Sequence, residues 1–549
     1  MSLPLFQAVG IFAASWLLWK TLKQWVLKSP LDNIPGPRSE SFVTGVFGKI
    51  FNNNAWAYHQ YLAEAFGSTI KVRALFGENE LFLFDPKAMH HVFVKDQHIF
   101  EETDQFIKGN NLFFGEGLLG TLGEQHRKQR KMLNPVFSIA HMREMLPTFY
   151  EVTYKVYYLR DTFSHKLRNG PQEIEVLSWM TRTALELIGQ SGLGYSFDNL
   201  TEESTPHPFS LAAKALVPTL SKLRYANAYL MPKLSTVGPA WFRRWVVNTL
   251  PWKKLHEVRD IVDTLHITSV EIFESKKKAL ADGDEAVAMQ IGRGKDIMSI
   301  LMKANMSAMK EESLTRDELI GQMSSLIFAA MDTTTSALAR LLYLMSVHQD
   351  VQDKLRAEIK EAKEQEGGEL SYDTVVSLPY LDAICRETLR LYSPVNLARR
   401  IARQDVVVPL FTPIKGVDGQ EIKEILVPKN TKVTVGLLAS NTNAELWGPD
   451  VLEWKPERWL NPLPEAVSAA HLPGIYSNLM TFIGGSRACI GFKFSQLEMK
   501  VVLMLLVESF KFKPTKDEIF WQMTGITTPV VVGSKKTIPQ LPMIVEKVL

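Results

Sequence analysis

The stretch that most constrains the fold is a glycine-rich loop that runs directly into an apolar helix. The loop reads Phe482-Ile483-Gly484-Gly485-Ser486-Arg487-Ala488-Cys489-Ile490-Gly491, and apolar residues then recur at helical spacing from Phe494 to Leu506. Because glycine lacks a Cβ, such a loop can approach a flat or bulky partner closely. The pattern predicts that Cys489 lies near a helix N-terminus, in a loop that can cradle a cofactor.

Cys489 is the first candidate for chemistry. The partial positive charge of a helix N-terminus favours a thiolate, and a cysteine thiolate can serve as an axial ligand that helps heme iron to cleave the O–O bond. Arg487 is placed to meet a heme propionate. The alternative is that Cys489 is a small buried hydrophobe. The only other cysteine is Cys385, which lies in an apolar helical pattern and is expected in the core, so a disulfide scaffold or four-cysteine zinc site is not supported.

The loop matches F-x-x-G-x-R-x-C-x-G at all five fixed positions and resembles the heme-binding signature of the cytochrome P-450 superfamily. The resemblance implies heme b with Cys489 as its iron ligand. It also implies that other loop residues contact the cofactor, namely Phe482, Gly484, Gly485, Arg487 and Gly491.

A second pattern lies in a long helix that is expected to begin with the capping box Thr315 to Glu318 and to continue to about Val347. Its middle reads Ala-Ala-Met-Asp-Thr-Thr-Thr, from Ala329 onward. Such polar side chains compete with a helix backbone, so the alternative is a surface stripe or back-bonded core threonines. The segment resembles the family's oxygen-activating helix, with Ala330 in place of the usual glycine. The resemblance implies that Thr333 hydrogen-bonds dioxygen and that Asp332 relays protons to it.

Further cofactor contacts are implied by resemblance. A basic run begins at His126, and by itself it reads as a solvated helix face. The family carries a Trp-x-x-x-Arg pair here that faces a heme propionate. Arg130 matches the arginine, whereas His126 stands where tryptophan is usual. Arg400, in an extended segment, is a further propionate contact by resemblance.

Pro379 is expected to open another helix, in which Glu387 and Arg390 are spaced to share one face. Alone, this is a routine helix pair. The family has a Glu-x-x-Arg helix that is completed by an arginine from a Pro-Glu-Arg segment, and Arg458 matches that arginine. The resemblance implies a buried structural triad of Glu387, Arg390 and Arg458.

The N-terminal residues 3–19 are nearly all apolar and are followed by lysines. Their length is near the lower limit for a membrane-spanning helix, and the position of the lysines predicts that the bulk of the chain stays in the cytosol. The alternative is a helix packed on the globular body. The expected organisation is a membrane anchor at 1–28, a proline-rich hinge at 29–40 and a heme-thiolate catalytic domain at 41–549. The expected location is the endoplasmic reticulum membrane, with a single pass.

Composition adds one exclusion and a fold class. A formal net charge of +3 over 549 residues gives no reason to expect nucleic-acid binding. Strands are expected at 70–75 and 81–84, and a terminal hairpin is expected between 527 and 545. These are too few for an all-β protein. The expected fold is mainly α with small β-sheets, the cytochrome P-450 fold with an N-terminal transmembrane helix.

The resemblance implies a monooxygenase that inserts one atom of O2 into an apolar small molecule. The sequence resembles fungal members, which suggests a secondary metabolite such as a terpenoid. No dinucleotide-binding fingerprint is evident, so electrons are expected from a separate NADPH-dependent flavoprotein reductase. The alternatives are an O2-independent heme-thiolate isomerase or dehydratase, and a non-catalytic heme-binding sensor. Candidate pocket walls are Phe113, Phe114, Phe328 and Val395.

Overall fold

The computed structural model describes residues 28–41, 43–167, 170–201, 204–534 and 538–548, together with Gln7, Ile11, Ser15 and Trp19. The expected membrane anchor therefore lies almost entirely outside the described residues. Among the residues that are described, no helix has both the length and the apolar character needed to cross a bilayer.

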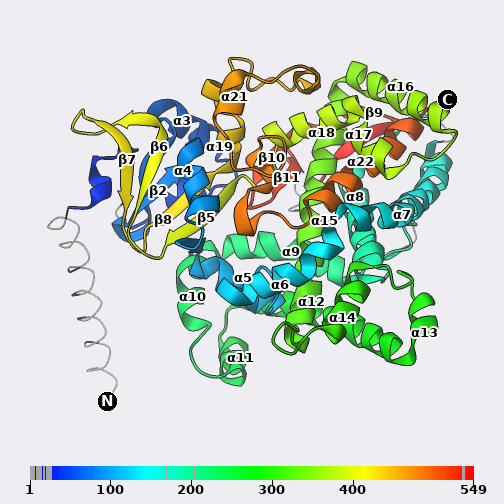
Figure 1. The fold of residues 1–549 in the computed structure, drawn as a ribbon, viewed down its shortest axis with the longest axis horizontal. Helices are drawn as coiled ribbons and strands as arrows, with labels where there is room; N and C mark the ends of the chain where they lie inside the picture. Colours follow the sequence, from blue (N-terminus) through cyan, green and yellow to red (C-terminus); the bar gives the residue numbers. More distant parts are fainter. Residues whose placement is uncertain are drawn as a thin grey trace. The chain divides into compact units, whose positions relative to one another are not determined.

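The chain forms two compact units, and each is composed of segments that are distant in sequence (Figure 1). The smaller unit contains residues 1–101, 397–448 and 465–486. The larger unit contains residues 102–396, 449–464 and 487–549. The glycine-rich loop divides between them after Ser486.

The smaller unit is built on a five-stranded sheet in the order β1-β2-β8-β5-β3. Its β1 and β2 pair antiparallel, which confirms the two strands expected here, and β2 pairs parallel with β8. A separate hairpin joins β6 and β7. The strand bounds are Thr69–Arg73 (β1), Asn79–Leu83 (β2), Phe100–Glu102 (β3), Leu397–Ala402 (β5), Val406–Lys415 (β6), Glu421–Val427 (β7) and Lys432–Gly436 (β8).

Pro35 and Gly36 of the expected hinge lie along β1. The Lys71 N–H donates to the Pro35 carbonyl at 2.9 Å. A Cβ on Gly36 would lie only 1.8 Å from the Lys71 carbonyl oxygen, so glycine is required for this close approach. The segment is held to the sheet edge by its backbone.

The larger unit is organised around α15 (Arg316–Val347). As expected, this helix begins with a capping box in which Thr315 and Glu318 each bond the other's backbone. It packs against α8 (Val176–Leu187), α12 (Lys253–Asp282) and α22 (Phe492–Ser509). Other helices are α5 (Asp104–Phe114), α6 (Gly123–Leu133), α7 (Ile139–Lys166), α9 (Pro208–Lys222), α11 (Ala240–Thr249), α14 (Ile297–Ser307), α16 (Gln349–Glu366) and α18 (Pro379–Leu391).

The expected terminal hairpin is wrong. Residues 527–531 form β11 (Thr527–Val531), which pairs with the preceding β10 (Ile519–Met523). Residues 542–547 form β12 (Pro542–Lys547), which lies in another sheet between β4 (Gln172–Glu175) and β9 (Phe510–Pro514). Strand β11 pairs with its neighbour β10, whereas one partner of β12, strand β4, lies far away in the sequence, so local pattern could not identify it.

Candidate functional site

The middle of α15 is accessible although most of this helix is buried. Side chains on both sides of residues 328–333 are almost entirely inaccessible, whereas Ala329 is exposed and Phe328, Ala330, Asp332 and Thr333 are half-buried. The ring of Phe328 lies 4.6 Å from that of Phe114 on α5. A ligand could therefore reach the oxygen-helix motif where small residues leave room beside the backbone.

Thr333 is the one accessible threonine of the three in this motif. Its hydroxyl donates to the Ala329 carbonyl at 2.7 Å, the back-bond that threonine often forms in helices. Thr335 makes the same bond to the Met331 carbonyl but is buried. Because its proton is engaged, Thr333 offers oxygen lone pairs to a ligand and must release Ala329 before it can donate.

Asp332 lies beside a lysine that sequence reasoning missed. Burial raises the pKa of Asp332 to about 6, and the positive charge of Lys214 on α9 acts in the opposite direction. Burial in turn lowers the pKa of Lys214, while Asp332 favours its charged form. Asp332 and Lys214 therefore shift each other's pKa at the accessible part of α15. The only sequence signal was a lysine within an apolar helical segment.

Behind Thr334, a buried carboxyl group lies between α15 and α22. Glu498 is completely buried, and neither carboxyl oxygen has a hydrogen bond of good geometry to a described residue. Thr334 is close enough to favour its ionised form slightly, but burial raises the pKa of Glu498 well above its usual value. The Thr334 and Ser495 hydroxyls lie 3.3 Å apart. Burial therefore favours the neutral acid form of Glu498, an effect that helical spacing alone did not reveal.

Cys489 precedes the first residue of α22 by three positions, as expected, and its side chain is exposed. The Gly491 N–H and the charge of Arg130 favour the thiolate, but the protein packed around the sulfur raises the pKa of the thiol overall. A bound cation such as iron would favour the thiolate further. Cys385, by contrast, is fully buried with a pKa of about 12, as a core cysteine should be.

Three basic side chains gather near Cys489. Arg130 on α6 donates to the Ala488 carbonyl at 2.7 Å, and Arg487 donates to the Thr121 carbonyl at 2.7 Å. Burial and the two arginine charges lower the pKa of His126 to about 3, so this histidine is neutral. Arg130 forms no ion pair with any carboxylate in the described part of the chain. The cluster suits an anionic group such as a heme propionate.

In the smaller unit, the loop glycines are required by close backbone packing. A Cβ on Gly484 would lie 1.7 Å from the Pro473 carbonyl oxygen. Gly485 has a φ of +73°, and its Cβ would lie 1.8 Å from the Phe93 carbonyl oxygen. The guanidinium of Arg400, which is buried in β5, lies 5.0 Å from the centre of the Phe93 ring. The roles of Phe482, Gly484, Gly485 and Arg400 toward a cofactor stay predictions.

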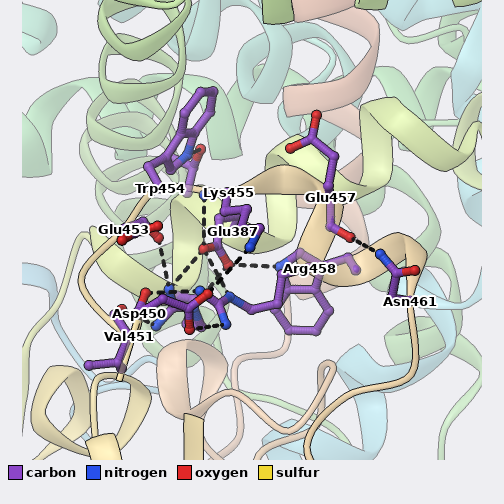
Figure 2. A network of polar contacts seen from close by, with 12 residues as sticks. Glu387, Asp450, Val451, Glu453, Trp454, Lys455, Glu457, Arg458 and Asn461 are labelled. Atoms are coloured by element: carbon purple, nitrogen blue, oxygen red, sulfur yellow. Dashed lines mark hydrogen bonds and ion pairs between the residues drawn. The ribbon is translucent and has the colours of Figure 1, made fainter. Parts of the chain in front are cut away.

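The expected triad forms one buried network (Figure 2). Arg390 donates to both oxygens of Glu387, at 2.9 and 2.8 Å, and Arg458 donates to Glu387 at 3.3 Å. Sequence reasoning missed two further members. The Trp459 indole donates to Glu387 at 3.0 Å, and Asp450 accepts from Arg458 at 2.9 Å. Two carboxylates therefore balance two guanidinium groups.

The donor set fits a heme. The exposed thiol of Cys489 before α22 could ligate iron. Arg130, which has no ion pair among the described residues, could bind a propionate, and the accessible small-residue segment of α15 could face the oxygen side. A buried structural pair such as Glu387 and Arg390 offers nothing comparable, because its polar atoms are already bonded within the protein.

Comparison with known proteins also indicates a heme protein. The family model for cytochrome P-450 matches residues 34–537. Cytochrome P-450 monooxygenase 91 of Postia placenta is 51% identical over 100% of this chain and 99% of its own length. Monooxygenase 212 of the same fungus is 50% identical over 96% of each chain, and the ganoderic acid synthetase CYP5150L8 of Ganoderma lucidum is 44% identical over 95% of each. The chain therefore belongs to the cytochrome P-450 family and is a monooxygenase, an oxidoreductase that incorporates oxygen into its substrate.

Proposed function

We propose that the protein inserts one atom of O2 into an apolar secondary metabolite of terpenoid type. The observation that carries this proposal is the accessibility of Thr333 and Asp332 in an otherwise buried helix, together with the exposed thiol of Cys489. The name of the ganoderic acid synthetase, whose sequence is 44% identical, supports the choice of fungal metabolite.

A heme b held by the Cys489 sulfur would supply the redox chemistry of oxygen activation. The protein contributes proton management and positioning. Asp332, with a pKa of about 6, can take a proton from solvent and pass it to the Oγ1 of Thr333. Thr333 can donate only after releasing the Ala329 carbonyl. Phe114 and Phe328 form an apolar contact that would exclude water from one side of the substrate.

Two further elements complete the proposal. The apolar residues 3–19, followed by lysines, support attachment to the endoplasmic reticulum membrane by a single helix, with the catalytic part facing the cytosol. An NADPH-dependent flavoprotein reductase in the same membrane would supply the electrons. An O2-independent isomerase or dehydratase is disfavoured by the accessible acid–alcohol pair, and consumption of O2 and NADPH would separate the two activities.

The test is coexpression of the full chain with a fungal reductase in yeast, followed by mass spectrometry of microsomes that are fed candidate terpenoids. A product heavier by one oxygen atom, with label from ¹⁸O2, is expected. Cys489→Ser should abolish both the product and the ferrous–carbonyl spectrum of a thiolate-ligated heme, whereas Cys385→Ser should keep both. An unchanged spectrum in Cys489→Ser would refute the ligand assignment, and an unlabelled product would refute the monooxygenation.

A further inference from the structure

A buried arginine lies on the same helix as the oxygen motif but outside its accessible part. Arg340 follows Thr333 by seven residues, so it lies two turns further along α15. All residues from Thr334 to Leu342 are buried, and Arg340 itself is only 7% exposed. The access that reaches Thr333 therefore does not extend along the helix to Arg340.

Two aromatic rings contact this arginine. The guanidinium carbon lies 3.5 Å from the ring centre of Trp521 on β10 and 4.1 Å from that of Tyr392, which follows α18. Such contacts stabilise a cation through the ring faces but provide no acceptor for its N–H groups. The two aromatic rings therefore stabilise the positive charge of Arg340 but accept no hydrogen bond from its N–H groups.

No described residue accepts a hydrogen bond from Arg340 or forms an ion pair with it. Its Nε atom is buried without a partner. A nearby polar group is already engaged, because the Ser336 hydroxyl donates to the Thr527 carbonyl at 2.6 Å. Burial lowers the pKa of Arg340 to about 9, and the phenol groups of Tyr392 and Tyr343 act in the opposite direction. At neutral pH a protonated guanidinium thus stays in the core without a counter-charge.

We propose that Arg340, Tyr392 and Trp521 form a binding site for one small monovalent anion, of the size of formate or a halide. The guanidinium is planar and its donors point outward in that plane, which matches a carboxylate or a spherical anion at its edge. The small exposed fraction of Arg340 excludes a bulky organic acid. The site does not depend on the proposed substrate and lies apart from the oxygen motif.

Anion binding at Arg340 should affect the stability of the fold. Arg340 contacts β10 through Trp521 and the segment after α18 through Tyr392, while Ser336 holds β11. A counter-anion would neutralise the charge at this junction of α15, the β10–β11 hairpin and the end of α18. Occupancy should therefore stabilise the folded protein by an amount that grows with the logarithm of the anion concentration once that concentration exceeds the dissociation constant.

The test uses the full-length holoprotein in gluconate buffer, in which formate or bromide replaces gluconate at constant ionic strength. The melting temperature of the wild type should rise with formate, and above the dissociation constant the rise should be linear in the logarithm of the formate concentration. Arg340→Met should abolish the rise, and Arg340→Lys should weaken it because a point charge lacks the planar fork. The matched control is Arg316→Met, since Arg316 is an exposed arginine at the start of the same helix and pairs with Glu274.

An equal rise in the wild type and in Arg340→Met, or no rise in the wild type, would overturn the proposal. A second measurement covers the case in which Arg340→Met does not fold. Crystals of the wild type grown with bromide should show an anomalous peak at hydrogen-bond distance from the Arg340 guanidinium. Density for water alone at that position, with no anomalous peak, would also overturn it.

Discussion

Arg390 and Glu387 form a two-point ion pair in which both side chains are completely inaccessible to solvent. Removal of one member leaves the other charge buried without its main partner, which typically costs about 3–5 kcal/mol of folding free energy. We expect Arg390→Met to reduce stability by this amount and to lower the yield of heme-containing protein. Urea unfolding followed by circular dichroism measures the change.

An exposed ion pair serves as the control for this prediction. Lys354 lies 3.1 Å from Glu457, and its side chain is 55% exposed. Because solvent and salt screen such a pair, Lys354→Met should leave the urea midpoint nearly unchanged. A similar loss in both variants would show that burial of the Glu387–Arg390 pair is not what matters.

The second prediction compares two threonines that make the same back-bond. Thr333→Ala removes an accessible hydroxyl, and Thr335→Ala removes a buried one. If the Thr333 hydroxyl delivers protons, Thr333→Ala should lower the rate of product formation by about 100-fold, the lower end of the range for general acid–base groups. NADPH consumption should continue, with peroxide as the by-product. Thr335→Ala should keep the wild-type ratio of product to NADPH, and equal losses in both variants would contradict the role of Thr333.

Much of this architecture could be predicted because its signals are local. The capping box of Thr315 and Glu318, Pro379 at the start of α18, and the spacing of Glu387 and Arg390 each depend on residues within one turn. Cys489 was identified by a motif whose members are adjacent in the chain. Such features can be predicted without knowing which distant residues meet in the folded chain.

The rest depends on elements that meet only in three dimensions. Lys214 reaches Asp332 from another helix, and Glu498 is an ordinary helical glutamate until α15 covers it. Arg340 likewise looked like part of a helix pattern, because Trp521 and Tyr392 lie far away in the sequence. The expected hairpin within 527–545 fails for the same reason, because β12 pairs with β4 and β9.

The third prediction concerns pH. The pKa of Asp332 in the folded protein, about 6, exceeds its ordinary value of 3.8, so the folded state binds this proton more tightly than the unfolded chain. The stabilising effect of the proton is complete below about pH 3.8 and is lost as the pH rises through about 6. Asp332→Asn carries no such charge. It should therefore gain stability relative to the wild type as the pH increases from 4 to 7, by at most about 3 kcal/mol.

A variant of Lys214 tests the electrostatic interaction between Lys214 and Asp332. Because its charge lowers the pKa of Asp332, Lys214→Met should move the midpoint of this pH-dependent stability difference to higher pH. The measurement is the melting temperature between pH 4 and 8 of the protein with Asp332 and of the Asp332→Asn variant. Each is measured with and without Lys214→Met. Lys222→Met, at the exposed end of the same helix, is the control and should leave the midpoint in place. An unchanged midpoint in Lys214→Met would contradict the coupling.

The last prediction concerns the protonation of Glu498. Since its carboxyl is buried, lacks well-formed hydrogen bonds to described residues and has a raised pKa, it should keep its proton at a pH at which solvent-exposed glutamates are ionised. Infrared spectra of the holoprotein should then contain the carbonyl stretch of a protonated carboxylic acid, and Glu498→Gln should remove it. The amide has nearly the same shape and no charge, so the melting temperature should change little.

A glutamate at the other end of the same helix provides the comparison. Glu508 is paired with Lys363 at 2.6 Å and its side chain is 36% exposed, so it lacks the enclosure on which the prediction for Glu498 depends. Glu508→Gln should therefore leave the protonated-acid band intact. If Glu498 were instead ionised, Glu498→Gln would relieve an uncompensated buried charge, so a large rise in melting temperature with no change in that band would refute the neutral assignment.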